Sequence, residues 1–253
     1  MNALALNPGR LTALGRSELT LLVRNRAALS VALLMPVMMV FVLRTTLSAD
    51  TAGALAEATL TGGIGMVLLL VVYMNLVSAF VARREELVLK RLRTGEAGDL
   101  EILAGTALPA AVIALVQIIA LALAGAAVLD APAPENPLLL VAAVLAALPL
   151  LAGMAAATSA FTRNVETAGI TTLPLFLLTA LGSGLFLPLD SLPDAVASIC
   201  ELLPLSGVMT LVRAGWSGGA AGGELLTAAA VTVAWIMVTV FAVQRWFRWE
   251  PRR

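Results

Sequence analysis

The sequence has 253 residues, of which 60% are hydrophobic and only 13% are charged, and its mean hydropathy is +0.97. Soluble domains average about 45–50% apolar and about 25% charged residues, so this composition excludes an ordinary soluble protein and predicts a membrane protein. The chain has no histidine and one cysteine, Cys200, which excludes an intrachain disulfide and the usual histidine and cysteine metal sites.

The first segment, residues 1–27, is predicted to be an amphipathic helix at the cytoplasmic membrane interface. Its leucines can share one helical side while Arg16, Arg24 and Arg26 point towards lipid headgroups. Charges interrupt its apolar residues, which is not typical of a cleaved signal peptide. A flexible basic leader is the alternative interpretation.

Six apolar windows then approach or exceed the roughly 20 residues that a transmembrane helix needs. They predict an all-α polytopic membrane protein, a single transmembrane domain with spans at residues 28–47, 60–82, 102–129, 137–161, 168–187 and 225–244. The first span is the weakest, because only 17 residues separate Arg26 from Arg44.

The basic residues are segregated between the two sides of the predicted membrane. Of the 16 lysines and arginines, 14 lie in the N-terminal segment, in residues 83–101, at Arg163 or in residues 245–253. Because short loops rich in lysine and arginine stay in the cytoplasm, both termini are predicted to be cytoplasmic and the protein to lie in the cell membrane.

Residues 83–101 form an island of charge, with ten of the chain's 32 formal charges in 19 residues between long apolar runs. We expect such an island to lie in water. Leu87, Leu89 and Leu92 alternate with charged residues in a helical pattern that stops at Thr94-Gly95, where glycine can take the left-handed C-terminal position. A helix of about ten residues is marginal in water, so it is expected to dock on a membrane surface or a soluble partner. A plain cytoplasmic loop is the alternative.

Residues 189–224, on the opposite side, contain apolar pieces too short to span a membrane and interrupted by Pro193 and Pro204. We expect short re-entrant helices, followed by a flexible glycine-rich return to the last span. Irregular backbone of this kind is tolerated where protein covers it.

Several chemistries are absent from the sequence. It has no P-loop, no GxGxxG and no HExxH, and the predicted spans contain no acidic residue. Proton-coupled carriers and intramembrane hydrolases normally need such groups. The chain is therefore predicted to be a non-catalytic subunit that receives its energy from another protein.

Four stretches carry a family resemblance: LLVRNRAALSVALLMPVMMVF from Leu21, REELVLKRLRTGEAGDLEILAG from Arg84, FTRNVETAG from Phe161 and the long segment 182–216 with its SG, LP and PL pairs before Arg213. They resemble the interfacial helix, coupling segment, cytoplasmic turn and outer segment of ABC-2 type permeases, the membrane subunits of ABC exporters with the type V, ABCG-like fold. Val88 and Leu89 depart from the family pattern, which often has a glycine there.

The resemblance implies an exporter built from two permeases, identical or homologous, and two nucleotide-binding ATPases. ATP and Mg would be held by the partner ATPase, with no cofactor on this chain and no nucleic acid among its partners. Such exporters move drugs, antibiotics, peptides or lipids outward. The residues that we expect to contact the ATPase are Glu85, Glu86, Leu87, Lys90, Arg91, Leu92 and Arg93.

The resemblance also suggests a substrate path, because spans 2 and 5 of the family line a cavity at the two-fold axis. The polar and aromatic residues at matching positions are Tyr73, Asn75, Ser78, Thr171, Thr172, Phe176 and Thr179. Such a lining suits an amphipathic or lipophilic substrate, since no buried charge is present to compensate an ionic one. The alternative is that these side chains form hydrogen bonds between helices.

Other functions remain open at this stage. A secondary carrier or channel that is not driven by ATP is the main alternative, followed by a lipid-processing enzyme or a membrane scaffold. Co-purification of an ATPase and inhibition by vanadate would distinguish the exporter from a carrier.

Overall fold

The computed structural model describes residues 52–95, 98–185 and 192–250, together with Leu34, Met38, Val40 and Phe41. The predicted interfacial helix, with Arg16, Arg24 and Arg26, and most of the first predicted span lie outside the described residues. All regular elements in the described part are helices, which confirms the all-α class there: α3 (Ala52–Val67), η2 (Leu68–Met74), α4 (Asn75–Glu85), α5 (Val88–Arg93), α6 (Asp99–Val128), α7 (Pro137–Phe161), α8 (Val165–Gly182), α9 (Asp194–Glu201), α10 (Ser206–Ser217) and α11 (Gly222–Trp246).

Five helices in the described part are long and apolar enough to cross a membrane. They are the continuous helix formed by α3, η2 and α4, together with α6, α7, α8 and α11, and they overlap the second to sixth predicted spans. The short helices α9 and α10 meet at 91°, as a broken span or a re-entrant loop does. The molecule is thus a multi-pass membrane protein.

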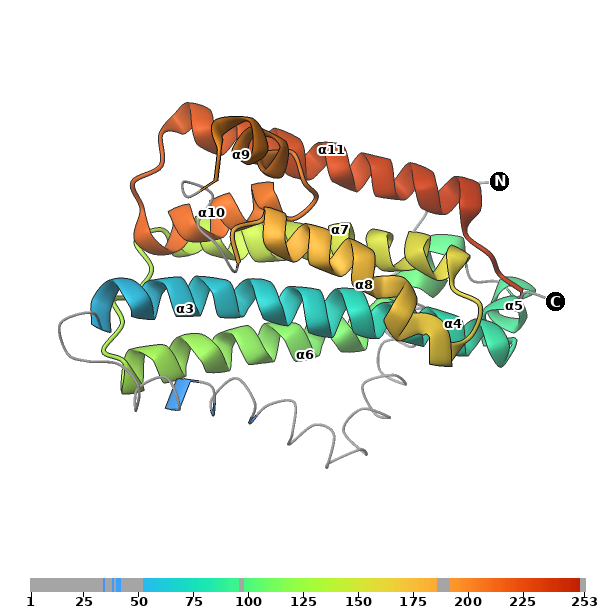
Figure 1. The fold of residues 1–253 in the computed structure, drawn as a ribbon. Coiled ribbons are helices and arrows are strands. Elements are labelled where there is room, and N and C mark those ends of the chain that lie inside the picture. The colour runs from blue at the N-terminus through green and yellow to red at the C-terminus, as the bar shows by residue number, and fades with distance from the viewer. Residues whose placement is uncertain are drawn as a thin grey trace.

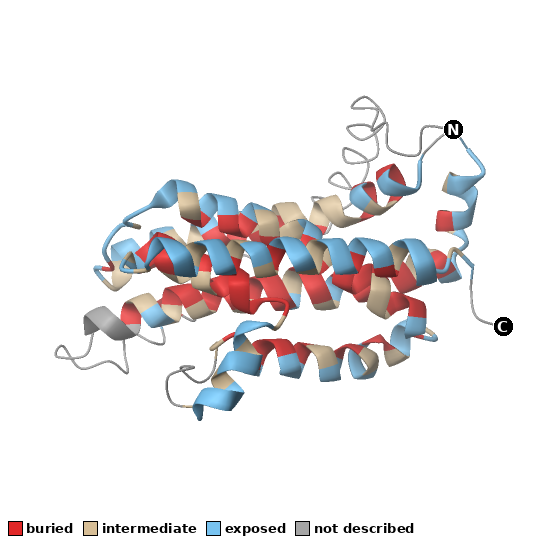
Figure 2. Cartoon of the chain, turned by 90° about the horizontal axis from the view of Figure 1, so that it is seen from above, coloured by how far each residue is buried: buried red, intermediate tan, exposed pale blue. Residues whose placement is uncertain are grey.

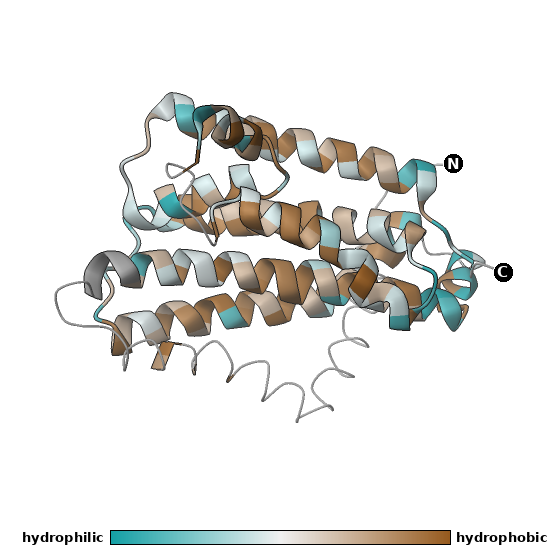
Figure 3. Cartoon of the chain, viewed as in Figure 1, coloured by the Kyte–Doolittle hydropathy of each residue, from teal (hydrophilic) through white to brown (hydrophobic). Residues whose placement is uncertain are grey.

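The helices run lengthwise, so the bundle has two ends (Figure 1). We call the one with α5 and residues 247–250 the α5 end, and the one with α9 and α10 the α9 end. Hydrophilic residues gather at the ends and hydrophobic residues along the middle (Figure 3). This distribution is expected of helices that cross an apolar layer.

Helix α7 lies at the centre and packs against α10, α11, η2 and α4. Its inward face carries small and aliphatic side chains that are fully buried, among them Ala147, Leu150 and Leu151. Buried residues face the middle of the bundle and exposed residues face outward (Figure 2). Many of the exposed side chains are large and apolar, such as Ile170 and Leu226, as suits contact with lipid.

Local signals in the sequence explain where α7 and α8 begin. The Asn136 side chain accepts a hydrogen bond from the Leu139 backbone N–H (3.0 Å), and Pro137 occupies the first helical position. Asn164 caps α8 in the same way through the Thr167 N–H (3.0 Å). This cap explains why α8 begins three residues before the predicted start at residue 168.

The continuous helix from Ala52 to Glu85 is longer than the predicted span 60–82 at both ends, since charged residues are tolerated where a helix reaches the interface. Its middle, η2, is a π-helical segment, a feature often found at functional sites. The segment contains Tyr73, the only tyrosine in the chain, which is fully buried.

Candidate functional site

The charged island of residues 83–101 is divided among three elements at the α5 end. Arg83 to Glu85 complete α4, Val88 to Arg93 form α5, and Asp99 begins α6. The proposed docking helix is therefore only six residues long, shorter than the predicted pattern.

The left-handed residue of this segment is Leu87 (φ 61°), and Gly95 does not adopt the left-handed conformation that was considered for it. The chain must turn sharply between α4 and α5, and Leu87 makes that turn. At the other end of α5, the Thr94 hydroxyl donates to the Arg91 carbonyl (2.8 Å) and the Gly95 N–H to the Leu92 carbonyl (3.1 Å). These bonds satisfy the last carbonyls without a left-handed residue.

The side chains of α5 point in three directions. Leu89 is fully buried and Leu92 is half-buried, three positions apart on the inward side. Lys90 and Arg93 form a second side, which contacts the end of the chain. Arg91 is exposed, as are Glu85, Glu86 and Leu87 just before the helix.

Arg84 corrects the expectation that the whole island lies in water, because its side chain is only 1% exposed. Its guanidinium group donates to the carbonyl oxygens of Ser159 (2.8 Å) and Thr162 (2.6 Å) at the C-terminal end of α7. A cation suits this position, where unpaired carbonyls and the helix dipole create negative charge. The sequence gives no signal that separates Arg84 from the exposed arginines around it.

The end of the chain returns to α5 after α11 (Figure 1). The Lys90 Nζ lies 2.9 Å from the Glu250 carboxylate, and the Arg93 guanidinium lies 4.6 Å from the centre of the Trp249 ring. Arg93 also forms a two-point ion pair with Asp99, at 3.0 and 3.3 Å. None of these contacts was predictable from the sequence.

The seven predicted substrate-path residues differ in exposure. Tyr73, Thr172, Phe176 and Thr179 are buried, Ser78 and Thr171 are half-buried and Asn75 is exposed.

Most of their polar groups are used within the chain. The Tyr73 hydroxyl is 3.2 Å from the Thr158 hydroxyl on α7, and Thr172 donates to the carbonyls of Ala168 (2.9 Å) and Gly169 (2.8 Å) in its own helix. Asn75 has no side-chain hydrogen bond to another described residue.

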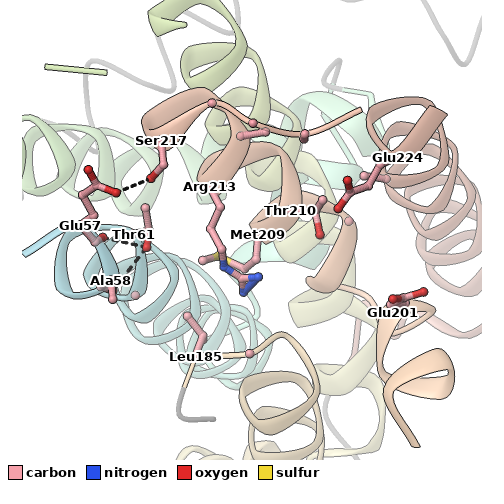
Figure 4. Close-up of a pocket in the computed structure, with 18 of the residues that line it drawn as sticks. Glu57, Ala58, Thr61, Leu185, Glu201, Met209, Thr210, Arg213, Ser217 and Glu224 are labelled. Carbon is pink, nitrogen blue, oxygen red and sulfur yellow. Dashed lines mark hydrogen bonds between the residues drawn. The ribbon is translucent and has the colours of Figure 1, made fainter. Parts of the chain in front are cut away.

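A cavity of about 1050 Å³ lies at the α9 end, between α3, the residues that follow α8, the last residue of α9, α10 and the start of α11. Three carboxylates, Glu57, Glu201 and Glu224, share its wall with one guanidinium, Arg213 (Figure 4). The remaining wall is apolar, glycine-rich or hydroxyl-bearing, and its side chains include Thr61, Leu185, Met209, Thr210 and Val231.

Two of these charged groups are fixed by neighbours. Glu57 accepts a hydrogen bond from the Ser217 hydroxyl (2.8 Å), and Arg213 donates to the Ser183 carbonyl. None of the seven predicted path residues lines this cavity. The cavity was not predicted from the sequence, because Glu57 lies more than 140 positions before Glu201 and Glu224 in the chain.

A family model described as ABC-2 type transporter matches residues 10–216 of the chain. No curated protein matches the sequence.

Proposed function

Because the chain belongs to the ABC-2 type transporter family, we propose that it is the permease subunit of an ATP-driven exporter that moves an amphipathic or lipophilic substrate outward. The family is the membrane component of ABC transporters, which pairs with a separate ATPase subunit. We further propose that α5 docks on this ATPase in the cytoplasm, and that a second permease copy, identical or homologous, completes the transporter.

The exposed side of α5 is the observation that carries this proposal. Arg91, Glu86 and Leu87 are exposed at the end of a membrane bundle, and neither charged group forms an ion pair with another described residue. A six-residue helix is too short to be stable by itself. A partner protein docked on the exposed surface would stabilise it. Charged groups beside a central apolar side chain are typical of a protein interface.

The test is charge reversal at Arg91 in the complex reconstituted with its ATPase. Arg91→Glu should lower ATP-driven transport at least about tenfold, because like charges placed across an interface cost several kcal/mol. Arg163→Glu, an exposed arginine in the turn between α7 and α8, is the matched control and should transport normally. Both variants should insert into membranes in wild-type amounts. Full transport by Arg91→Glu, or transport that resists vanadate and stops with an ionophore, would contradict the proposal.

The orientation can be tested separately by labelling cysteines in a Cys200→Ser background. Asp194 and Glu201 are exposed on α9, whereas Arg91 and Arg163 are exposed at the opposite end. An impermeant maleimide should label Asp194→Cys and Glu201→Cys in intact cells, and Arg91→Cys and Arg163→Cys only after permeabilisation. The reverse pattern would contradict a cytoplasmic α5.

The cavity at the α9 end supports the amphipathic class of substrate. Its wall combines apolar side chains such as Met209 and Val231 with carboxylates and hydroxyls. An amphipathic molecule has an apolar part and a polar part, and this wall offers a surface for each. We propose that a substrate passes this cavity on its way out.

A further inference from the structure

The segment Phe247–Glu250, which we call the tail, is attached to the α5 end at three points. Phe247 packs edge-on against Phe80 of α4, with ring centres 5.9 Å apart, and against Trp249 at 5.0 Å. Trp249 in turn lies beneath the Arg93 guanidinium, and Glu250 pairs with Lys90. The tail therefore contacts both α4 and α5 within four residues.

These contacts add to the few others that hold α5, among them the ion pair between Arg93 and Asp99 of α6. Helix α5 is six residues long, and Leu89 is its one fully buried side chain. The turn that leads into it places Leu87 in the left-handed region, which costs about 1–2 kcal/mol in a non-glycine residue.

The tail also links α5 to a distant span. It follows directly from Trp246, the last residue of α11, and α11 packs on α7 and α10. A displacement of α5 therefore acts on α11 through the tail as well as on α4 through the covalent turn.

We propose that the tail is a positioning element that fixes α5 for its ATPase and joins α11 to the coupling movement. On this view Lys90 and Arg93 bind the tail, whereas Arg91 of α5 meets the ATPase together with Glu86 and Leu87, which precede the helix. The inference rests on the proposed function, but the contact itself can be tested without an ATPase.

The first experiment uses the fact that Lys90 is the only lysine in the chain. A carbodiimide joins an amine to a carboxylate without a spacer, and the Lys90 and Glu250 groups are 2.9 Å apart. In the purified full-length chain, trypsin digestion and mass spectrometry should show peptide 85–91 joined to peptide 249–252. Glu250→Gln should abolish this product. Linkage of Lys90 only to a glutamate within its own peptide would overturn the proposal.

The second experiment measures function in the complex with its ATPase. Trp249→Ala removes the ring beneath Arg93 and should lower substrate-stimulated ATP hydrolysis about threefold to tenfold, as expected for loss of a cation–π contact and an aromatic pair. The matched control is Trp246→Ala, three residues earlier, whose ring is 52% exposed and contacts Phe241 rather than α5. This control should keep wild-type activity, and Trp249→Phe should keep most of it.

A charge exchange separates positioning from general damage. The Lys90 and Glu250 side chains are 52% and 64% exposed, so their ion pair is weak and the single variants Lys90→Glu and Glu250→Lys should each lose about twofold to threefold. The double variant should recover that loss, whereas Glu250→Lys should not rescue Arg91→Glu. If the wild type is active and Trp249→Ala has the same substrate-stimulated ATP hydrolysis as Trp246→Ala, the tail does not position α5. The proposed exporter function would still stand. If the wild type has no ATP-driven transport but the cross-link forms, the exporter proposal fails and the tail contact remains.

Discussion

Arg84 is buried, where a charged side chain is destabilising unless its N–H groups form hydrogen bonds. Burying an arginine in protein costs several kcal/mol, and each hydrogen bond to a charged group contributes about 1.5–3 kcal/mol of stability. Arg84 makes two such bonds to the last carbonyls of α7 and so ties the end of α4 to the turn between α7 and α8. Its role is therefore structural in the first place.

We predict that Arg84→Leu destabilises the protein by about 3 kcal/mol or more, because two carbonyls lose charged donors. In purified protein the melting temperature should fall by about 5–10 °C. Arg84→Lys should recover only part of the loss, since an ammonium group does not present two donors in a fixed plane. Arg163→Leu, in the same turn but exposed, should melt like the wild type, and equal losses at the two positions would contradict the assignment.

At the scale of elements, α10 is held by close backbone contacts. A Cβ atom on Gly215 would lie 2.7 Å from the Leu140 backbone nitrogen and 2.9 Å from its Cα. The loop before α7 also bonds to α10, through the Asn136 N–H to the Gly215 carbonyl (2.9 Å) and the Glu135 N–H to the Trp216 carbonyl (3.1 Å). Small residues allow such approach between helices in membranes.

Gly215→Ala should therefore destabilise the protein by about 1–3 kcal/mol, because backbone atoms of α7 cannot move aside as a flexible side chain does. Gly222→Ala, at the start of α11, is the control, since a Cβ there would meet nothing within 4 Å. Thermal unfolding in detergent should show a clear decrease for the first variant and no decrease for the second. Equal melting temperatures would mean that α10 can shift without cost.

The long helices could be predicted from the sequence because continuous apolar runs have few alternatives in a membrane. For α7 the predicted bounds and the observed ones coincide, since Asn136 and Pro137 mark its start in the sequence itself. The start of α3 and the π segment around Tyr73 were not predictable. Contacts between distant parts of the chain were equally unpredictable, such as the hydrogen bond from the Ser217 hydroxyl to Glu57 of α3, 160 positions away.

The candidate site was only partly predictable for a related reason. The charge island pointed to the α5 end, but the sequence could not show that Lys90 and Arg93 face the tail while Arg91 faces outward. Helical spacing puts Lys90 and Arg93 on one side, yet it does not say what covers that side. The partners, Trp249 and Glu250, lie more than 150 residues further along the chain.

At the scale of the whole molecule, the two ends are joined by helices that cross the full bundle. The continuous helix Ala52–Glu85 passes the cavity at Glu57, near its start, and ends at Glu85, from which α5 is separated only by Glu86 and Leu87. Helix α11 likewise begins at the cavity, near Glu224, and ends at the tail. In the proposed exporter, a movement of α5 therefore reaches the cavity walls along two continuous helices.

The expected substrate path can be examined at Asn75 and Thr172, which differ in their surroundings. Asn75 is exposed on α4 and has no side-chain hydrogen bond to a described residue. An amide group that faces lipid without a hydrogen bond is energetically unfavourable. It is therefore better placed than the buried candidates to face a substrate path or a second copy. Thr172 is buried and donates to carbonyls of its own helix.

We predict that Asn75→Ala changes the transport of some substrates by about twofold to tenfold and leaves that of others unchanged. This range corresponds to the free energy of one hydrogen bond. Thr172→Ala should change the transport of all substrates alike, in proportion to the amount of folded complex, because the Thr172 hydroxyl bonds to carbonyls of its own helix. The measurement is transport of a panel of amphipathic compounds that differ in hydrogen-bonding groups, normalised to folded protein. Asn75→Ala could instead lower the transport of every substrate equally, and only in proportion to the loss of folded complex. In that case Asn75 has a packing role and the substrate path lies elsewhere.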